Sequence, residues 1–145
     1  MRLTAFAFSL LAAPLLAQAA PAPGEGAPAN ARVFFIGVKD GDVVPTKLRV
    51  QFGLEKMKVR PAGEDIFDRN SGHHHLLIDS GPIPRGQMIM LDAKNIHYGK
   101  GQTEDEIKLE PGPHTLTLQF ADGAHTSYGP SLSATIHVLA DVNAK

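Results

Sequence analysis

The feature that most constrains the fold of this chain is an alternation of apolar and polar side chains with a period of two. Residues 48–54 read LRVQFGL and residues 115–120 read TLTLQF, with an apolar residue at every second position. Successive side chains of a strand point to opposite faces of a sheet, so this period indicates half-buried strands. No segment has a sustained helical period. The pattern therefore predicts an all-β fold.

Turn signals rich in glycine, proline and aspartate separate several further short apolar runs. Six or seven short strands with turns between them are typical of a single immunoglobulin-like antiparallel β-sandwich of about seven strands, and we expect that domain to span residues 32–140. The three consecutive apolar residues at 76–78 favour a central strand that is covered on both faces. Besides the two alternating runs, we expect strands at 33–38, 73–78, 103–109 and 134–139, with a short one at 89–91.

The segment LEPGPHTL (109–116) also favours the sandwich. In immunoglobulin-like domains a Gly-x-Tyr at this corner ties the strand back through the tyrosine hydroxyl. Gly112-x-His114 would put an imidazole in the same place. We therefore expect His114 to have a structural role.

The first residues, MRLTAFAFSLLAAPLLAQAA, combine the positive Arg2, an apolar run and the small residues of Ala17-Gln18-Ala19. This pattern predicts a secretory signal peptide over residues 1–19, cleaved after Ala19. The apolar run is too short for a comfortable membrane span, and no later segment is long enough. Residues 20–31 are rich in proline, alanine and glycine and should form a disordered leader. The expected product is an exported protein of the bacterial periplasm.

Composition removes several classes of function. The chain has no cysteine, so a metal would have to be held by histidine, methionine, carboxylate or backbone groups. Loss of Arg2 with the signal would leave 13 basic and 15 acidic residues, without the basic patch that a nucleic-acid partner requires. The chain also has no tryptophan and few aromatic residues, which disfavours a carbohydrate-binding face.

Several blocks of the sequence carry a resemblance to a known family. The stretches VFFIGVKDGDVVPTKLRVQFGLEKMKVRPAGE, SGHHHLLID and HYGKGQTEDEIKLEPGPHTLTLQFADGAH, from Val33 to Val138, together resemble the domain-of-unknown-function family 4399. The resemblance implies a small exported bacterial protein without a settled activity, and some members carry a label that ties them to rod-shape determination. Members usually read close to His-x-His-Phe-Gly-Lys-Gly in the middle block, where this chain has Asn95-Ile96-His97-Tyr98-Gly99-Lys100-Gly101.

Three consecutive histidines lie in SGHHHLLID (71–79), at the start of an expected strand. Strand alternation puts His73 and His75 on one face and His74 on the other, with Leu76 and Ile78. A His-x-His pair on one face brings two imidazoles within reach of one ion. Two ligands do not complete a site, because zinc needs three or four.

The further ligands must come from elsewhere in the chain. His97 lies in a glycine-flanked segment and His125 in an expected loop at one end of the sandwich, where loops cluster. We predict a metal site of His73, His75 and His97, completed by His125 or by an acidic residue, Glu64 or Asp65. The ion would be copper, with zinc as the alternative, because cupric copper accepts imidazole and oxygen, and cuprous copper accepts imidazole and thioether.

The remaining histidines and methionines have plainer interpretations. We expect His74 to pack at the edge of the core with one nitrogen hydrogen-bonded, and His137 to be exposed. Met57 should fill the core, and Met88 and Met90 should anchor the long connection from 79 to 102.

Catalysis has little support in the sequence. There is no cysteine nucleophile, and nothing like a nucleophile elbow surrounds Ser71 or Ser80. The segment GKGQTE (99–104) is not a phosphate loop, because the required Gly-x-x-x-x-Gly-Lys-Ser/Thr spacing is missing. We therefore predict a non-catalytic protein that binds a transition metal.

Two other readings remain open. In the first, the protein is a structural or interaction module of the cell envelope, its histidines are hydrogen-bonded scaffold, and its partner is an envelope protein. In the second, it binds an anion through Lys100 or Arg85 pointing into the same pocket. Imidazole nitrogens that converge on one point would favour a metal. Imidazoles that each meet a separate carbonyl or carboxylate would favour the scaffold.

Overall fold

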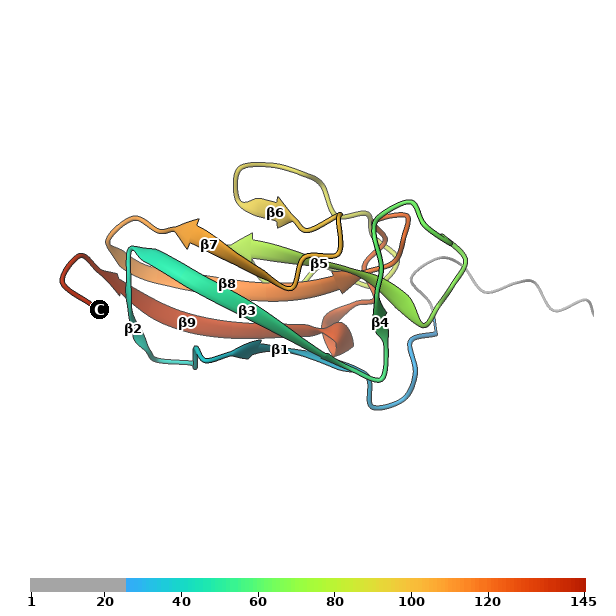
Figure 1. The fold of residues 1–145 in the computed structure, drawn as a ribbon, viewed down its shortest axis with the longest axis horizontal. Coiled ribbons are helices and arrows are strands. Elements are labelled where there is room, and N and C mark those ends of the chain that lie inside the picture. Colours follow the sequence, from blue (N-terminus) through green and yellow to red (C-terminus); the bar gives the residue numbers. More distant parts are fainter. Residues whose placement is uncertain (1–25) are drawn as a thin grey trace, which may run out of the picture.

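A computed structural model describes residues 26–145, and the regular secondary structure there is almost entirely β-strand (Figure 1). Ala27 and Ala31, at the end of the expected leader, pack against the core. The predicted signal peptide, 1–19, lies outside the described residues. The described strands are β1 (Arg32–Ile36), β2 (Val43–Pro45), β3 (Lys47–Glu55), β4 (Lys58–Val59), β5 (Ser71–Ile78), β6 (Asn95–His97), β7 (Glu104–Lys108), β8 (Gly112–Ala121) and β9 (Ser133–Asp141).

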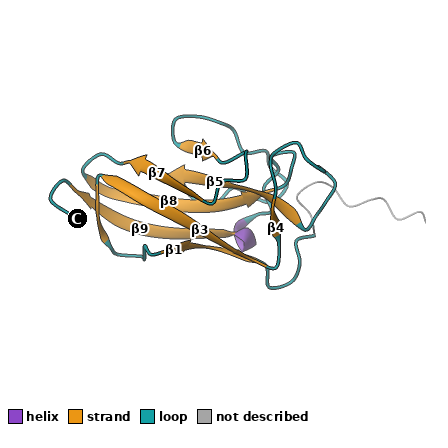
Figure 2. Cartoon of the chain, viewed as in Figure 1, coloured by secondary structure: helices purple, strands orange, loops and turns teal. Residues whose placement is uncertain are grey.

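The strands form two sheets. A three-stranded sheet has the order β1-β3-β7, and a six-stranded sheet has the order β2-β9-β8-β5-β4, with β6 also paired to β5. Apolar side chains from both sheets form one core, in which Val50 and Phe52 of β3 face Leu118 and Phe120 of β8. The apolar positions of the alternating runs 48–54 and 115–120 therefore lie on the inner faces of the two sheets. Between residues 26 and 145 the helical structure is one short 3₁₀ turn, Pro130–Leu132 (Figure 2), and no helix there could cross a membrane.

The prediction of an all-β fold is confirmed, but the details differ. The described residues contain nine strands rather than about seven, because β2, β4 and β6 are only two or three residues long and carry no alternating pattern. The sheets are not purely antiparallel, since β2 pairs with β9 and β4 pairs with β5 in parallel. The strand expected at 89–91 is wrong. Only an isolated bridge from Met88 to Thr126 forms there, and the true strand of this connection is β6.

Strand β5 is buried on both faces along nearly its whole length, as its apolar run predicted. One face packs into the core between the sheets. The other is the outer face of the six-stranded sheet, where Leu77, Ala121 and Ile89 form a second, smaller apolar cluster. Ile89 belongs to the connection between β5 and β6, so this connection folds back over the outer face and covers it.

Polar side chains of the outer face hold the connection between β5 and β6 in place through hydrogen bonds to its backbone. The Gln119 side-chain oxygen accepts a bond from the Ile83 amide (3.1 Å), and the Thr117 hydroxyl donates to the Ser80 carbonyl (2.8 Å). The Gln119 amide donates to the Gly129 carbonyl (3.0 Å) as well. These partners satisfy buried polar groups that would otherwise cost stability.

Candidate metal centre

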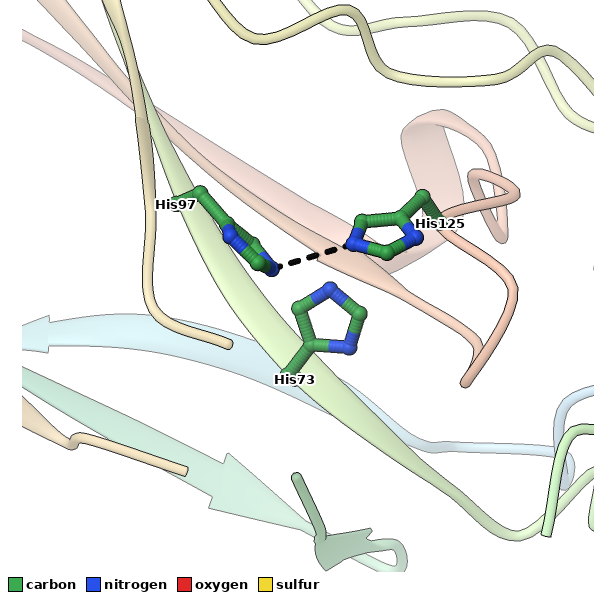
Figure 3. Close-up of side chains that lie close together, drawn as sticks. All are labelled: His73, His97 and His125. Atoms are coloured by element: carbon green, nitrogen blue, oxygen red, sulfur yellow. Dashed lines mark hydrogen bonds between the residues drawn. The ribbon is translucent and has the colours of Figure 1, made fainter. Parts of the chain in front are cut away.

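Strand register assembles three histidines on the outer face of the six-stranded sheet. His75 of β5 lies directly opposite His97 of β6, and His73 is two residues away on the same face of β5. His125, from the loop between β8 and β9, adds a fourth ring. The ring centroids of His73, His97 and His125 lie 4.8–4.9 Å from one another (Figure 3), and His75 lies 4.8 Å from His73 and 5.0 Å from His97.

The loop that carries His125 is held in a specific shape. The Asp122 carboxylate accepts hydrogen bonds from the backbone amides of Ala124 and Thr126, both at 2.9 Å. The His125 carbonyl accepts a bond from the Ile89 amide (2.9 Å). His125 itself has a φ of 65°, a left-handed conformation that few residues other than glycine adopt. Such strain persists where the surroundings enforce it and clusters at functional sites.

His97 is positioned by a close approach to Gly99. A Cβ atom on Gly99 would lie 2.1 Å from Cε1 and 2.3 Å from Nε2 of the His97 ring. Only glycine leaves room for the imidazole there. The glycines next to His97 are apparent in the sequence, but this contact is not, because it depends on where the His97 ring lies. Gly101, in contrast, has a φ of 81° and serves the chain reversal.

The ring nitrogens converge in two close pairs. Nε2 of His73 lies 3.0 Å from Nε2 of His75, and Nε2 of His97 lies 3.2 Å from Nε2 of His125. One nitrogen each from His73, His97 and His125 lie within 4.8 Å of one another, a grouping in which a metal ion could be held. Nitrogens bonded to one ion at 2.0–2.1 Å are about 2.9 Å apart in a square arrangement and about 3.3 Å apart in a tetrahedron. The two observed pair distances fall in that interval.

Other polar partners are missing from this cluster in the described part of the chain. Neither Nδ1 of His73 nor Nδ1 of His75 has a hydrogen-bond partner, although both side chains are fully buried. No carboxylate belongs to the group of possible ligands within residues 26–145. The rings are therefore oriented by strand register, by the contact with Gly99 and by the Asp122 loop. Most metal-binding histidines are instead fixed by a hydrogen bond from their second nitrogen.

Three imidazoles of the cluster, those of His73, His75 and His97, are held neutral because their pKa values are lowered. Burial lowers the pKa of His73 to about 3 and that of His75 to about 2, and repulsion between neighbouring imidazolium charges adds to both shifts. Burial and His125 lower the pKa of His97 as well. A neutral imidazole keeps a lone pair on one nitrogen, which is the form that binds metals.

The structure brings together all four histidines proposed from the sequence, but the three that lie closest together are not the three that were predicted as the main ligands. The tightest group of possible ligands is His73, His97 and His125, and His75 joins it through His73. His97 lies at the end of a short strand rather than in a loop. The acidic candidates do not join the group, and Asp65 instead lies 3.6 Å from the Arg60 guanidinium.

The other histidines lie in different surroundings. His114 is a corner residue as predicted, since its Nε2 donates to the Glu110 carbonyl (2.8 Å) and its Nδ1 lies 2.9 Å from Asp79. His137 is exposed as predicted and contacts Asp40.

The expectation for His74 is wrong in one respect. The ring packs in the core between Phe52 and Phe120, at centroid distances of 5.4 and 5.0 Å. Neither of its nitrogens has a partner with hydrogen-bond geometry among the described residues. Burial lowers the pKa of His74 to about 4, and the nearby Gln102 backbone opposes that shift only in part.

The methionine prediction is half wrong. Met57 packs against the core as expected. Met88 and Met90 do not anchor the connection, because they are 64% and 68% exposed, whereas Ile89 between them is 2% exposed. The anion-binding reading also loses one of its residues, since the Arg85 guanidinium bonds to the Tyr128 carbonyl and the Ser131 hydroxyl.

Fold and site together define a two-sheet β-protein with a partly buried cluster of imidazoles on the outer face of its larger sheet. The chain belongs to the family described as Domain of unknown function (DUF4399), whose model matches residues 50–141. The match includes all four histidines of the cluster and begins within β3. No curated protein and no solved structure matches the chain.

Proposed function

We propose that this protein binds one transition-metal ion through His73, His97 and His125, with His75 as a fourth ligand, and that it does so without catalysis. The observation that carries the proposal is the convergence of imidazole nitrogens, in pairs at 3.0 and 3.2 Å, with no carbonyl or carboxylate partner in the described residues. Three or four nitrogen donors at this spacing match the coordination number of zinc and copper sites.

Copper is the preferred ion, with zinc as the alternative. Imidazole suits both metals, and for a given set of nitrogen ligands Cu²⁺ binds more tightly than Zn²⁺. Within residues 26–145 the grouped ligand atoms are all imidazole nitrogens, which argues against Mg²⁺ and Ca²⁺, since these ions prefer oxygen ligands.

The competing function, an envelope interaction module with scaffold histidines, explains less. Scaffold histidines in this same chain have carbonyl or carboxylate partners, as His114 and His137 do. Among the described residues, the cluster rings bond only to one another, and two of their nitrogens are buried without a partner. The core histidine His74 also lacks a partner, but it lies between two aromatic rings, whereas the four cluster imidazoles meet at one place. That meeting of several nitrogen donors favours a metal over a scaffold.

We further propose that the protein works outside the cytoplasm, in the periplasm, where it stores, buffers or delivers the metal. Support for the location comes from the signal-like first 19 residues. The chain has no cysteine, so imidazole and thioether are the side chains that could hold the metal by nitrogen and sulfur.

We also propose that the body is an immunoglobulin-like sandwich. The order β1-β3-β7 corresponds to strands A-B-E of such domains, and β9-β8-β5 to strands G-F-C. His114 then occupies the corner between strands E and F, where its bond to the Glu110 carbonyl replaces that of a tyrosine.

Metal titration of the untagged, stripped protein tests the proposal, because a histidine tag would compete for the ion. We expect one Cu²⁺ or Zn²⁺ per chain by calorimetry. Binding should be lost in a His73→Gln/His75→Gln variant, which keeps polar side chains of similar size. His137→Ala is the matched control, because it removes an exposed histidine outside the cluster.

Circular dichroism of each metal-free variant separates loss of the site from loss of the fold. A folded double variant that still binds one ion as tightly as the parent would overturn the proposal. So would a parent protein that binds neither ion.

A further inference from the structure

A hollow on the surface lies next to the histidine cluster. Its volume is about 310 Å³, and it is lined by Met88, Ile89, Met90, Leu91 and His125. Met88 and Met90 expose most of their surface, whereas Ile89 between them is buried, so both methionine side chains lie on the solvent side of the connection. His125 therefore belongs to two environments, the cluster and the hollow.

The methionine segment is fixed relative to the histidines. The Ile89 amide donates to the His125 carbonyl (2.9 Å), and Met88 forms a β-bridge with Thr126. On the other side, the Asn95 side-chain amide donates to the Met90 carbonyl (3.0 Å). These bonds tie the segment both to the loop that carries His125 and to the strand that carries His97.

Thioether sulfur is a soft ligand that selects cuprous copper over Cu²⁺ and Zn²⁺. Two exposed methionines contribute nothing to the core, and their apolar surface in water is unfavourable. Binding of a soft cation would give both side chains a function. An imidazole beside two thioethers is a ligand set suited to Cu⁺.

We propose that Met88, Met90 and His125 form an outer Cu⁺ site through which the ion reaches the histidine cluster. His125 is the shared ligand, because it lines the hollow while its Nε2 lies 3.2 Å from Nε2 of His97. The ion moves by exchange of ligands and reaches the cluster as Cu⁺, which imidazoles also bind, so no electron donor or acceptor is involved. Delivery of the ion to the histidine cluster rests on the proposed function. The outer site itself does not, because it depends only on Met88, Met90 and His125.

Anaerobic titration with Cu⁺ against a competing chelator tests the outer site, together with X-ray absorption to detect sulfur bound to copper. The parent protein should show sulfur ligands. A Met88→Leu/Met90→Leu variant, which keeps the apolar shape without sulfur, should lose that signal and bind Cu⁺ at least about tenfold more weakly. Its Zn²⁺ binding should be unchanged. Met57→Leu, at a methionine packed against the core, is the matched control.

The outcomes for the two sites can be told apart. If the His73→Gln/His75→Gln variant binds no Zn²⁺ but keeps a sulfur-bound Cu⁺, the outer site is independent of the deep ligands, as proposed. If no metal binds the cluster of the parent but sulfur-bound Cu⁺ is found, the proposed function fails and the outer site stands. Absence of a sulfur signal in the parent, with equal Cu⁺ affinity in the Met88→Leu/Met90→Leu variant, would overturn the outer site.

Discussion

Two groups of histidines in this protein lie in opposite surroundings. At the start of β8, both nitrogens of His114 have oxygen partners, the Glu110 carbonyl and the Asp79 carboxylate. In the cluster on the outer face, His73 and His75 are more deeply buried, yet their Nε2 atoms face each other and their Nδ1 atoms have no partner among the described residues. The fold thus supplies oxygen partners to an imidazole at one place and withholds them at another.

That difference indicates what each group is for. The same outer face also satisfies Gln119, whose amide and carbonyl both reach backbone partners, so the sheet can accommodate polar side chains. Buried polar groups without partners cost about 1–3 kcal/mol each. We therefore take the corner histidine as part of the scaffold and the cluster as a site prepared for a ligand. The following experiments test that contrast.

Acidification should produce the largest effect, and it should act through the buried histidines. Unfolded histidines have a pKa near 6.5, whereas His73, His74 and His75 have folded values of about 3, 4 and 2. Between those values the unfolded state binds more protons, so stability is present above about pH 6.5 and is lost as the pH falls below it. Each histidine contributes up to about 1.4 kcal/mol per pH unit.

Urea denaturation of the metal-free protein at pH 7.5, 6.5 and 5.5 measures this slope. His74→Leu removes a titrating group from the core without touching the cluster face, so it should make the slope shallower by about one proton. A parent stability that does not change over this range would contradict the buried, neutral state of these rings.

Truncation of the corner histidine should weaken the fold and spare the site. His114→Ala removes the bonds to Glu110 and Asp79, and we expect the free energy of unfolding to fall by about 1–3 kcal/mol. Metal stoichiometry and affinity should match those of the parent. A loss of metal binding in the folded variant would show that the two groups of histidines are not separate.

Substitution of Gly99 and of Gly101 by alanine should have opposite effects, the first on metal affinity and the second on stability. Gly99→Ala would push against the far end of the His97 side chain, so the ring should swing away and metal affinity should fall at least about tenfold with little loss of stability. Gly101→Ala forces a φ of 81° on alanine, so it should cost about 1 kcal/mol of stability and leave His97 in place. Calorimetry measures the metal affinity of both variants, and thermal melts measure their stability. If both substitutions lowered the affinity equally, Gly99 would have no special role in positioning His97.

The last comparison, of two substitutions at His125, should give a difference in stability of only about 1 kcal/mol. Both His125→Gly and His125→Ala should lose metal binding. The glycine variant should be more stable than the alanine variant by about 1 kcal/mol, because glycine tolerates the φ of 65°. Thermal melts without metal measure the difference. The reverse order would mean that the left-handed conformation at this position is not a source of strain.

Much of the fold and part of the candidate site could be predicted from the sequence, because they follow from local patterns of residues. The period-two runs marked the inner faces of β3 and β8, and the His-x-His spacing placed His73 and His75 on one face of β5. The loop position of His125 was enough to nominate it. In each of these cases the relevant neighbours are close in the chain or follow from strand alternation.

What could not be predicted depends on contacts between distant segments. β6 is too short to have a recognisable pattern, so the register of His97 against His75 was invisible. The role of Gly99 depends on the orientation of a single ring. The exposure of Met88 and Met90 follows from Ile89 taking the inner position and bonding to the His125 loop, a contact of long range. His74 lacks a partner because aromatic rings surround it.

The three segments that supply the rings are far apart along the chain, and His97 and His125 alone are 28 residues apart. An ion bound to β5, β6 and the β8–β9 loop would therefore act as an inorganic cross-link, in a protein that has no cysteine for a disulfide. Cross-links that close long loops restrict the unfolded chain. The connection over the outer face could then open only by breaking a coordinate bond, so metal loading would also appear as resistance of that connection to proteolysis.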